Sequence, residues 1–228
     1  MAFIAVSAIR GCVHGEDLRA DLLWTAVFGG CAVVLLAVAG SLGIRVLLRA
    51  QLPVQIRRGN LAAGIAAGAH YAATGLVVAR CFYGDDVGTL GLSVVFFVIA
   101  QVTLHLLVAL FRSLTVYADD QEIAGENVAA ALSYAGAMLA IAVIVGHAAE
   151  GDFDGWGQSL RAYGLALLSA LVLYPVRQLL VQTVLLKLPF ALRGGGLDRL
   201  VAQEQNVGAS AVEAVTYLAA AFLATGIA

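Results

Sequence analysis

The stretch N-V-A-A-A-L-S-Y-A-G-A-M-L-A-I-A-V-I-V-G-H-A, residues 127–148, is one Asn followed by an apolar run with no Asp, Glu, Lys or Arg. About 20 consecutive apolar residues are enough for an α-helix to cross the roughly 30 Å hydrocarbon core of a bilayer. The run is continuous and rich in Ala, without the alternation of lipid-facing and lumen-facing side chains that a barrel strand shows. It therefore predicts a transmembrane helix and excludes a β-barrel.

Two more stretches begin in the same way, with N-L-A-A-G at Asn60 and N-V-G-A-S at Asn206. Counted from each Asn, small residues recur three, eight and thirteen positions on: Ala63, Ala130 and Ala209; Gly68, Ala135 and Ala214; Ala73, Ala140 and Ala219. Self-similarity of this kind indicates an internal repeat. We expect one membrane unit to be used three times.

Composition extends the membrane assignment to the whole chain, because 61% of its 228 residues are apolar and only 12% are charged. Soluble domains average about 25% charged residues. Six stretches are long enough to span a bilayer, at 22–48, 61–82, 90–111, 128–148, 160–186 and 207–228. No connection between them is long enough for a folded soluble domain. The prediction is an all-α polytopic membrane protein with six transmembrane helices.

The expected organisation is a tail or interfacial helix over 1–20, followed by repeats over 21–84, 85–151 and 152–228. Each repeat has one helix going in, a charged loop and an Asn-initiated helix coming out. Units with an even number of spans share one orientation, as in parallel repeats related by an axis along the membrane normal. If the units pack alike, they should be arranged with approximate threefold symmetry.

Orientation follows from the basic residues, since Lys and Arg near a span resist translocation. The side of the Asn loops carries Arg45, Arg49, Arg57, Arg58, Arg112, Lys187, Arg193 and Arg199, and the other side only Arg10, Arg19, Arg80 and Arg161. The Asn loops should be cytoplasmic, with both termini outside. The outer side then holds a surplus of acidic residues, including Glu16 and Asp152. These acids either concentrate cations modestly or are simply tolerated there.

Asn60, Asn127 and Asn206 each stand where a helix begins. An Asn side chain there accepts hydrogen bonds from the free N–H groups of the first turn. The alternative is a polar ring of the three residues at the cytoplasmic mouth of an axial pathway, and both roles are compatible. The positions four and eight after each Asn are small, which allows close helix packing in lipid; they are Gly64, Gly68, Ala131, Ala135, Ser210 and Ala214.

The stretch T-V-Y-A-D-D-Q-E-I-A-G-E-N-V-A-A-A-L, residues 115–132, resembles the YjfL-like family of bacterial inner-membrane proteins of unknown function. R-R-G-N-L-A-A-G over 57–64 is similar. Q-E-Q-N-V-G-A-S over 203–210 departs from the pattern, since it lacks the Gly before the Asn and follows a longer, Gly-rich loop. The resemblance implies a multi-pass helical protein of the inner membrane, and it implies no activity.

Glu213 and Arg177 are ionisable residues inside predicted spans, where burial is expensive unless they are paired or hydrated. At about 1.5 Å per residue, Glu213 lies about 10 Å and Arg177 about 15 Å from the cytoplasmic edge. Their depths therefore predict an intramembrane ion pair. The pair either holds the last hairpin together or forms a charge relay or cation site with Glu213 as its carboxylate, beside Tyr217.

His70 and His105 are predicted at similar depth on the second and third spans, with Gln101 one turn from His105. They are either neutral side chains hydrogen-bonded between helices or groups that pass protons. Two His and one Glu are too few for a metal site, and we expect no metal and no cofactor. Cys12 and Cys81, both on the predicted outer side, are either a disulfide or two free thiols.

No P-loop, dinucleotide-binding Gly motif or H-E-x-x-H motif is present, and we expect no enzyme activity. The near-neutral chain, with a net charge of -2, predicts no nucleic-acid partner. The expected partners are the lipid bilayer, cations and further copies of the chain. The leading hypothesis is permeation of protons or small cations. The alternative is a scaffold or stress-response partner that recruits cytoplasmic proteins through Asp119, Asp120, Glu122 and Glu126.

Overall fold

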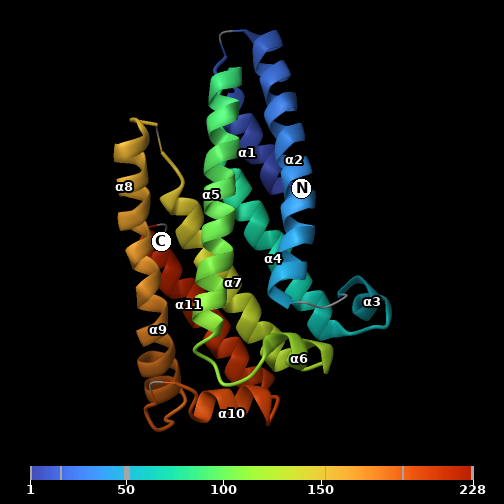
Figure 1. Cartoon of the computed structure of the whole chain (residues 1–228), viewed down its shortest axis with the longest axis vertical. Coiled ribbons are helices and arrows are strands. Elements are labelled where there is room, and N and C mark those ends of the chain that lie inside the picture. The colour runs from blue at the N-terminus through green and yellow to red at the C-terminus, as the bar shows by residue number, and fades with distance from the viewer. Residues whose placement is uncertain (1, 16, 49–51, 152, 192, 227–228) are drawn as a thin grey trace.

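The computed structural model describes residues 2–15, 17–48, 52–151, 153–191 and 193–226, and every regular element in these ranges is helical (Figure 1). In chain order the elements are α1 (Ala2–Cys12), α2 (Leu18–Leu48), α3 (Leu52–Arg57), α4 (Leu61–Cys81), α5 (Val87–Arg112), α6 (Asp119–Ala124), α7 (Val128–Ala148), α8 (Trp156–Leu167), η1 (Leu168–Val172), α9 (Leu173–Pro175), η2 (Val176–Leu185), α10 (Gly196–Ala202) and α11 (Val207–Thr225). Glu16, Arg49 and Asp152, which entered the orientation argument, and the predicted last span residue Ala228 lie outside the described residues.

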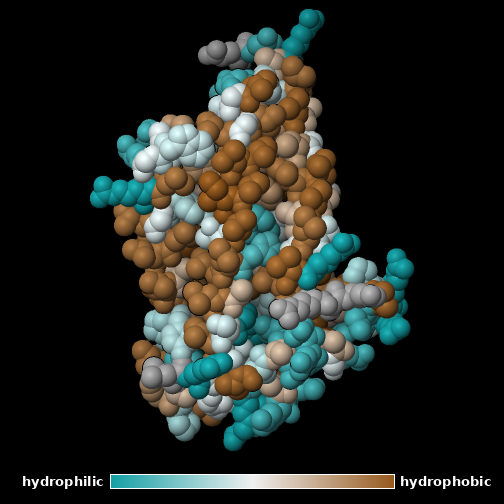
Figure 2. Space-filling model, viewed as in Figure 1, coloured by the Kyte–Doolittle hydropathy of each residue, from teal (hydrophilic) through white to brown (hydrophobic). Residues whose placement is uncertain are grey.

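Six helical stretches are long and apolar enough to cross a membrane: α2, α4, α5, α7, the continuous run from α8 to η2, and α11. They coincide with the six predicted spans. Apolar side chains cover the body of the molecule, and hydrophilic residues gather at the end that carries α3, α6 and α10 (Figure 2). The chain is a multi-pass membrane protein whose helices contact the lipid bilayer. We call the end at which α4, α7 and α11 begin the Asn end.

The three Asn-initiated helices lie in a row. In Figure 1, α4, α7 and α11 run at an incline across the more upright α2, α5 and α8. Helix α7 packs along both α4 and α11, whereas α4 and α11 make no comparable contact among the described residues. The expected threefold arrangement is therefore wrong, because the two neighbours of α7 occupy its two sides and do not close around a common axis.

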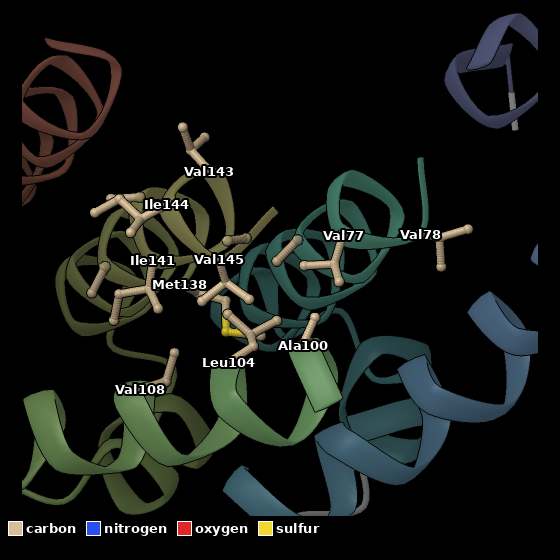
Figure 3. Packing of buried hydrophobic residues seen from close by; sticks show 14 of the residues in the cluster. Val77, Val78, Ala100, Leu104, Val108, Met138, Ile141, Val143, Ile144 and Val145 are labelled. Carbon is tan, nitrogen blue, oxygen red and sulfur yellow. The ribbon is translucent and has the colours of Figure 1, made fainter. Parts of the chain in front are cut away.

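The core lies where α4, α5 and α7 meet. Met138, Ile141 and Val145 of α7 face Val77 of α4 and Leu104 of α5 (Figure 3). All five side chains are buried. These side chains form an apolar layer at the centre of the bundle (Figure 3).

Helix α1 packs against α2 and α4 through Ile4, Ala8 and Cys12, which are buried and spaced at four residues, so that they share one face. Cys12 and Cys81 are free thiols, and the disulfide of the sequence analysis is not formed. Both are buried and act as small apolar side chains. Burial raises the pKa of the Cys12 thiol.

The fifth span is irregular around Pro175. Residues 168–172 form a tight 3₁₀ turn and residues 176–185 a wide π-helix. Proline cannot donate a backbone hydrogen bond to the turn before it, so a regular α-helix is interrupted there. The widened helix carries Arg177, Gln178 and Gln182, all of which are buried.

Candidate functional site

Each of the three Asn side chains caps its own helix. The Oδ1 atoms of Asn60, Asn127 and Asn206 accept hydrogen bonds from the backbone N–H groups of Ala63, Ala130 and Ala209, each at 3.0 Å. The cap predicted from the sequence is therefore formed three times, and it satisfies one of the free donors of each first helical turn.

The side-chain amide nitrogens of Asn60 and Asn127 also donate hydrogen bonds to other helices. Nδ2 of Asn60 donates to the carbonyl of Ile123 in α6, and Nδ2 of Asn127 donates to the carbonyl of Val201 in α10, each at 2.9 Å. Each bond joins one Asn-initiated helix to the short helix that precedes the next one. Asn60 and Asn127 are buried in these contacts. The predicted polar ring around an axis is therefore not formed.

Replacing Asn127 by Ala should lower the free energy of unfolding by about 2–4 kcal/mol, because the helix loses its cap and the buried carbonyl of Val201 loses its donor. Asn206→Ala removes only the cap within the chain and should cost about 1 kcal/mol. Unfolding of monomeric protein in detergent measures both. Equal losses for the two variants would contradict the role given to the Val201 contact.

Arg177, on η2, is the centre of a buried ionic cluster. Its Nε donates to Glu213 of α11 at 2.7 Å, and its Nη2 donates to Asp198 of α10. The side chains of Arg177, Asp198 and Glu213 are 2%, 0% and 0% exposed. The Tyr217 hydroxyl donates to the same Glu213 oxygen at 2.8 Å. The ion pair expected from the depths of Arg177 and Glu213 is thus present, with a second carboxylate added.

A second buried guanidinium belongs to Arg112, at the end of α5. Its Nε and Nη2 hold the two oxygens of Asp119, at 2.8 and 2.5 Å. It also donates to Ser133 and to the hydroxyl of Tyr117, which in turn donates to Ser133. Burial raises the pKa of the Tyr117 hydroxyl, so this group stays neutral at pH 7.

The two clusters act on one another, since Arg112 is close enough to Glu213 to interact with it electrostatically. Together they contain two guanidinium groups and three carboxylates, Asp119, Asp198 and Glu213. With every group ionised, the cluster carries one negative charge in excess. One oxygen of Glu213, Oε2, is buried and has no hydrogen-bond partner. One further positive charge, a proton or a cation, would neutralise the cluster.

Asp198 and Arg112 were not recognised as site residues from the sequence. Asp198 stands in the linker after the Gly-rich loop, and Arg112 had been read only as a basic residue at the edge of a span. The predicted pair of Arg177 with Glu213 is already balanced in charge, so it gives no sign of either residue.

His70 and His105 meet between α4 and α5, with ring centroids 5.3 Å apart. Nδ1 of His105 lies 2.6 Å from the carbonyl of Gln101 one turn earlier. Its Nε2 has no partner, and neither ring nitrogen of His70 makes a well-formed hydrogen bond, although the backbone of Ala39 lies nearby. The Gln101 side chain donates to Thr74 at 3.2 Å. The two His rings are thus adjacent, without the interhelical hydrogen bond that one interpretation required.

Gly43 of α2 closes this His pair from the side, since a Cβ added to it would overlap both Nε2 atoms. The two nitrogens therefore point toward the same spot. Unpartnered polar atoms this deeply buried are rare in proteins and call for water, an ion or a functional reason. No group of three or more His, Cys, Asp and Glu side chains that could hold a metal occurs in the described part of the chain.

The predicted small-residue contacts divide into two groups. Ala131, Ala135 and Ser210 are buried, and Ala214 lies so close to Gly136 of α7 that a Cβ at Gly136 would overlap its backbone. Gly64 and Gly68 of α4 instead have no atom within 4 Å of where a Cβ would lie. Among the described residues of one chain, therefore, the G-x-x-x-G pair packs against no other helix, and its role in helix packing stays a prediction.

A cleft of about 350 Å³ enters from the opposite end of the bundle and reaches Cys81 on α4 and Phe96 on α5. From these residues to Thr74 and Gln101, the nearest buried polar side chains on the same helices, there are seven and five residues. At 1.5 Å per residue, an apolar layer about 8–11 Å thick separates the cleft from the polar half. Val77, Val78 and Ala100 of Figure 3 lie within this layer, whereas Leu104 and Val108 lie on the Asn side of Gln101.

The acidic loop considered for recruitment of partners is partly used within the chain. Asp119 pairs with Arg112, and Glu122 accepts from Asn127 at 2.8 Å. Asp120 and Glu126 have no ion pair among the described residues. The loop therefore presents two acids rather than four.

The family comparison agrees with a membrane protein of uncharacterised function. The model of the family described as "Domain of Unknown Function (DUF350)" matches residues 1–82 and 85–227. The chain is similar to a "UPF0719 transmembrane protein" of Aquifex aeolicus (strain VF5), with 24% identity over 183 residues, which is 79% of this chain and 66% of the relative. The chain thus spans slightly less than two thirds of that relative's length.

No solved structure matches the chain. The finer resemblance to the YjfL-like family stays a prediction. Because the family model covers nearly the whole length, from the first helix to the end of α11, the chain belongs to the DUF350 family of membrane proteins.

Proposed function

We propose that this protein conducts protons or small cations across the bacterial inner membrane, with Glu213 as the carboxylate that takes up the positive charge. The observation that carries the proposal is the excess carboxylate of the buried cluster, together with the unpartnered Oε2 of Glu213. An intramembrane carboxylate without full pairing is typical of proton relays and ion pathways.

Further buried polar groups support a path from the cluster toward the middle of the membrane. The Tyr134 hydroxyl of α7 is buried without a partner and interacts electrostatically with Arg112 and Asp119. Seven residues before Arg112, on the same face of α5, His105 meets His70. Their unpartnered nitrogens can accept and release a proton, which suits a relay.

The apolar layer between the His pair and the cleft acts in this proposal as a closed gate. Hydrophobic constrictions exclude water and so block ions. With a thickness of about 8–11 Å, or one and a half to two helical turns, this layer is far thinner than the bilayer. A modest separation of α4, α5 and α7 would let water connect the cleft with Thr74 and Gln101.

The proposal includes the orientation and repeat organisation inferred from the sequence. The Asn end is cytoplasmic, both termini are outside, and the chain consists of three related two-helix units. The excess of basic residues at the Asn end supports this orientation.

The test is flux into proteoliposomes, measured in turn with protons, potassium and a polyamine. We expect wild type to conduct at least one of them, and Glu213→Gln to reduce that flux to the leak of protein-free vesicles, because the neutral amide cannot take up a positive charge. Glu204→Gln is the matched control. Glu204 is an exposed carboxylate at the same end, paired with Arg199 at 3.2 Å, and its loss should leave flux unchanged.

Folded Glu213→Gln protein with wild-type flux would show that the site is structural only. Absence of flux for all three ions, with folded wild-type protein, would contradict permeation. The scaffold hypothesis would then take its place, and neutralising Asp120 and Glu126 would be the variant to test for loss of a cytoplasmic partner.

A further inference from the structure

We infer that the chain assembles head to tail, with α4 of one copy packing on the lipid-facing side of α11 of the next. This inference is independent of the proposed permeation. Its tests measure mass and cross-linking rather than flux. It comes from the contact between neighbouring Asn-initiated helices. The chain makes this contact twice, between α4 and α7 and between α7 and α11, and in the described part of the chain one face of α4 and one face of α11 have no such neighbour.

Helix α7 shows the complete pattern. One of its faces receives α11, with Gly136 against Ala214. Another face meets α4, with Gly146 against Leu76 and the stem of Arg80, and Ala131 and Ala135 belong to the same stripe at helical spacing. Counted from the Asn, position nine of α7 therefore meets position eight of α11.

Applied once more, the same rule pairs Val215 of α11 with Gly68 of α4 in another copy. Val215 is 66% exposed, and Gly68 is exposed with nothing within 4 Å of where a Cβ would lie. Exposure to lipid alone would carry no inference. The residue sizes are complementary, however, because the internal contact pairs Gly with Ala and the proposed one pairs Val with Gly.

The buried fraction of the three Asn-initiated helices is highest for the helix that has two such neighbours. In the most apolar part of each span, 78% of the residues of α7 are buried, 56% of those of α4 and 28% of those of α11. The helix with two Asn-initiated neighbours is thus the most covered. Helix α11, which has only one such neighbour, is the least covered of the three.

The hydrogen bonds between Asn amides and short-helix carbonyls are also incomplete at α11 and at α3. Asn60 and Asn127 donate to Ile123 and Val201, but no acceptor for the Asn206 amide occurs in the described ranges, and Asn206 is exposed. The counterpart of Ile123, four residues before its Asn, is Ile56 in α3, which is 43% exposed. The Asn206 amide of one copy therefore fits the Ile56 carbonyl of the next.

The positions of the short helices α3, α6 and α10 favour the same assembly. Helix α6 packs on α4, and α10 packs on α7, so each short helix covers the Asn end of the preceding long helix. In the described ranges, the Asn end of α11 carries no short helix other than α10, which leads into it. In its own chain, α3 lies before Asn60 as α6 lies before Asn127 and α10 before Asn206. The α3 helix of a second copy would therefore cover the Asn end of α11. Head-to-tail contacts of this kind give a closed ring or an open chain, depending on the rotation between copies.

Cysteine cross-linking in native membranes tests the contact. Gly68→Cys and Val215→Cys together should give interchain disulfides under mild oxidation, and within one chain α7 separates the two positions. Wild type, with three free thiols, and each single variant are the controls. Cross-linking by Val215→Cys alone would indicate a symmetric contact, and no cross-linking by the double variant would show that the faces do not meet. Either result would overturn the inference.

A second measurement does not depend on cysteines. Gly68→Leu should convert oligomers into monomers in native mass spectrometry from nanodiscs while the unfolding temperature stays within a few degrees of wild type, because nothing in the chain occupies that space. Asn206→Asp, which keeps the cap and removes the donor, should lower the oligomeric fraction. Wild type that is monomeric in nanodiscs, or Gly68→Leu with unchanged mass, would overturn the inference.

Discussion

Arg177→Met should destabilise the protein more than any other single change at the buried cluster, by about 3–5 kcal/mol, because it leaves buried charge without a counter-ion. Asp198 and Glu213, both with fully buried side chains, would then face each other across the space vacated by the guanidinium. Met retains much of the volume of Arg, so the loss comes mainly from charge. Unfolding in mixed micelles by increasing detergent strength measures the difference.

Arg199→Met is the matched control for this prediction. Arg199 and Glu204 form an exposed pair at the same end of the molecule, with side chains 61% and 48% exposed. Exposed pairs contribute only about 0–1 kcal/mol. A further variant combines Arg177→Met with Glu213→Gln and should recover part of the loss, since only Asp198 then lacks a counter-ion. If Arg177→Met unfolds at the same point as wild type, the cluster does not stabilise the fold.

The spans were predictable because apolar length is a local property of the sequence. The residues at which the spans begin and end were less predictable. Helix α5 begins at Val87, three residues before the predicted start, because the Asp86 side chain accepts from the backbone of Gly88 and Thr89 and so starts the helix early. The predicted span counted only the apolar run, and the cap lies outside it. The start of α7 matched because its cap, Asn127, directly precedes the apolar run.

The ion pair of Arg177 and Glu213 was predictable from depth alone, because both residues lie in helices of known rise. Asp198 was not, because it lies in a linker whose path back onto the bundle no periodicity reveals. Arg112 was misjudged for a similar reason. Its position at the edge of a span does not show whether it extends to lipid headgroups or, as the structure has it, into the protein toward Asp119.

The arrangement of the Asn-initiated helices could not be derived from their similarity. Similar units favour similar contacts, and α4 with α7 and α7 with α11 are indeed both extensive. Whether α11 returns to α4 depends on the angle between successive contacts, which small changes in side-chain size alter. In this chain the row stays open, and the unused faces of α4 and α11 are the consequence.

The close contact between Gly136 and Ala214 gives the second large expected effect. Gly136→Ala should destabilise the protein by about 3 kcal/mol, because the added Cβ meets the backbone of α11 and not a side chain that can rotate away. In an open helical position the same change stabilises by up to about 1 kcal/mol, since Ala is the better helix former. Gly30→Ala on α2, with nothing within 4 Å, is the matched control and should show that gain.

The same substitution links packing to the charged cluster. Ala214 directly follows Glu213, so α11 cannot move away from α7 without changing the position of Glu213 relative to Arg177 on η2. We therefore expect Gly136→Ala to reduce the flux in proteoliposomes as well as the stability, whereas Gly30→Ala leaves flux unchanged. A Gly136→Ala protein as stable as the Gly30→Ala control would show that the two helices have room to separate. The tight contact would then not be what holds Glu213 in place.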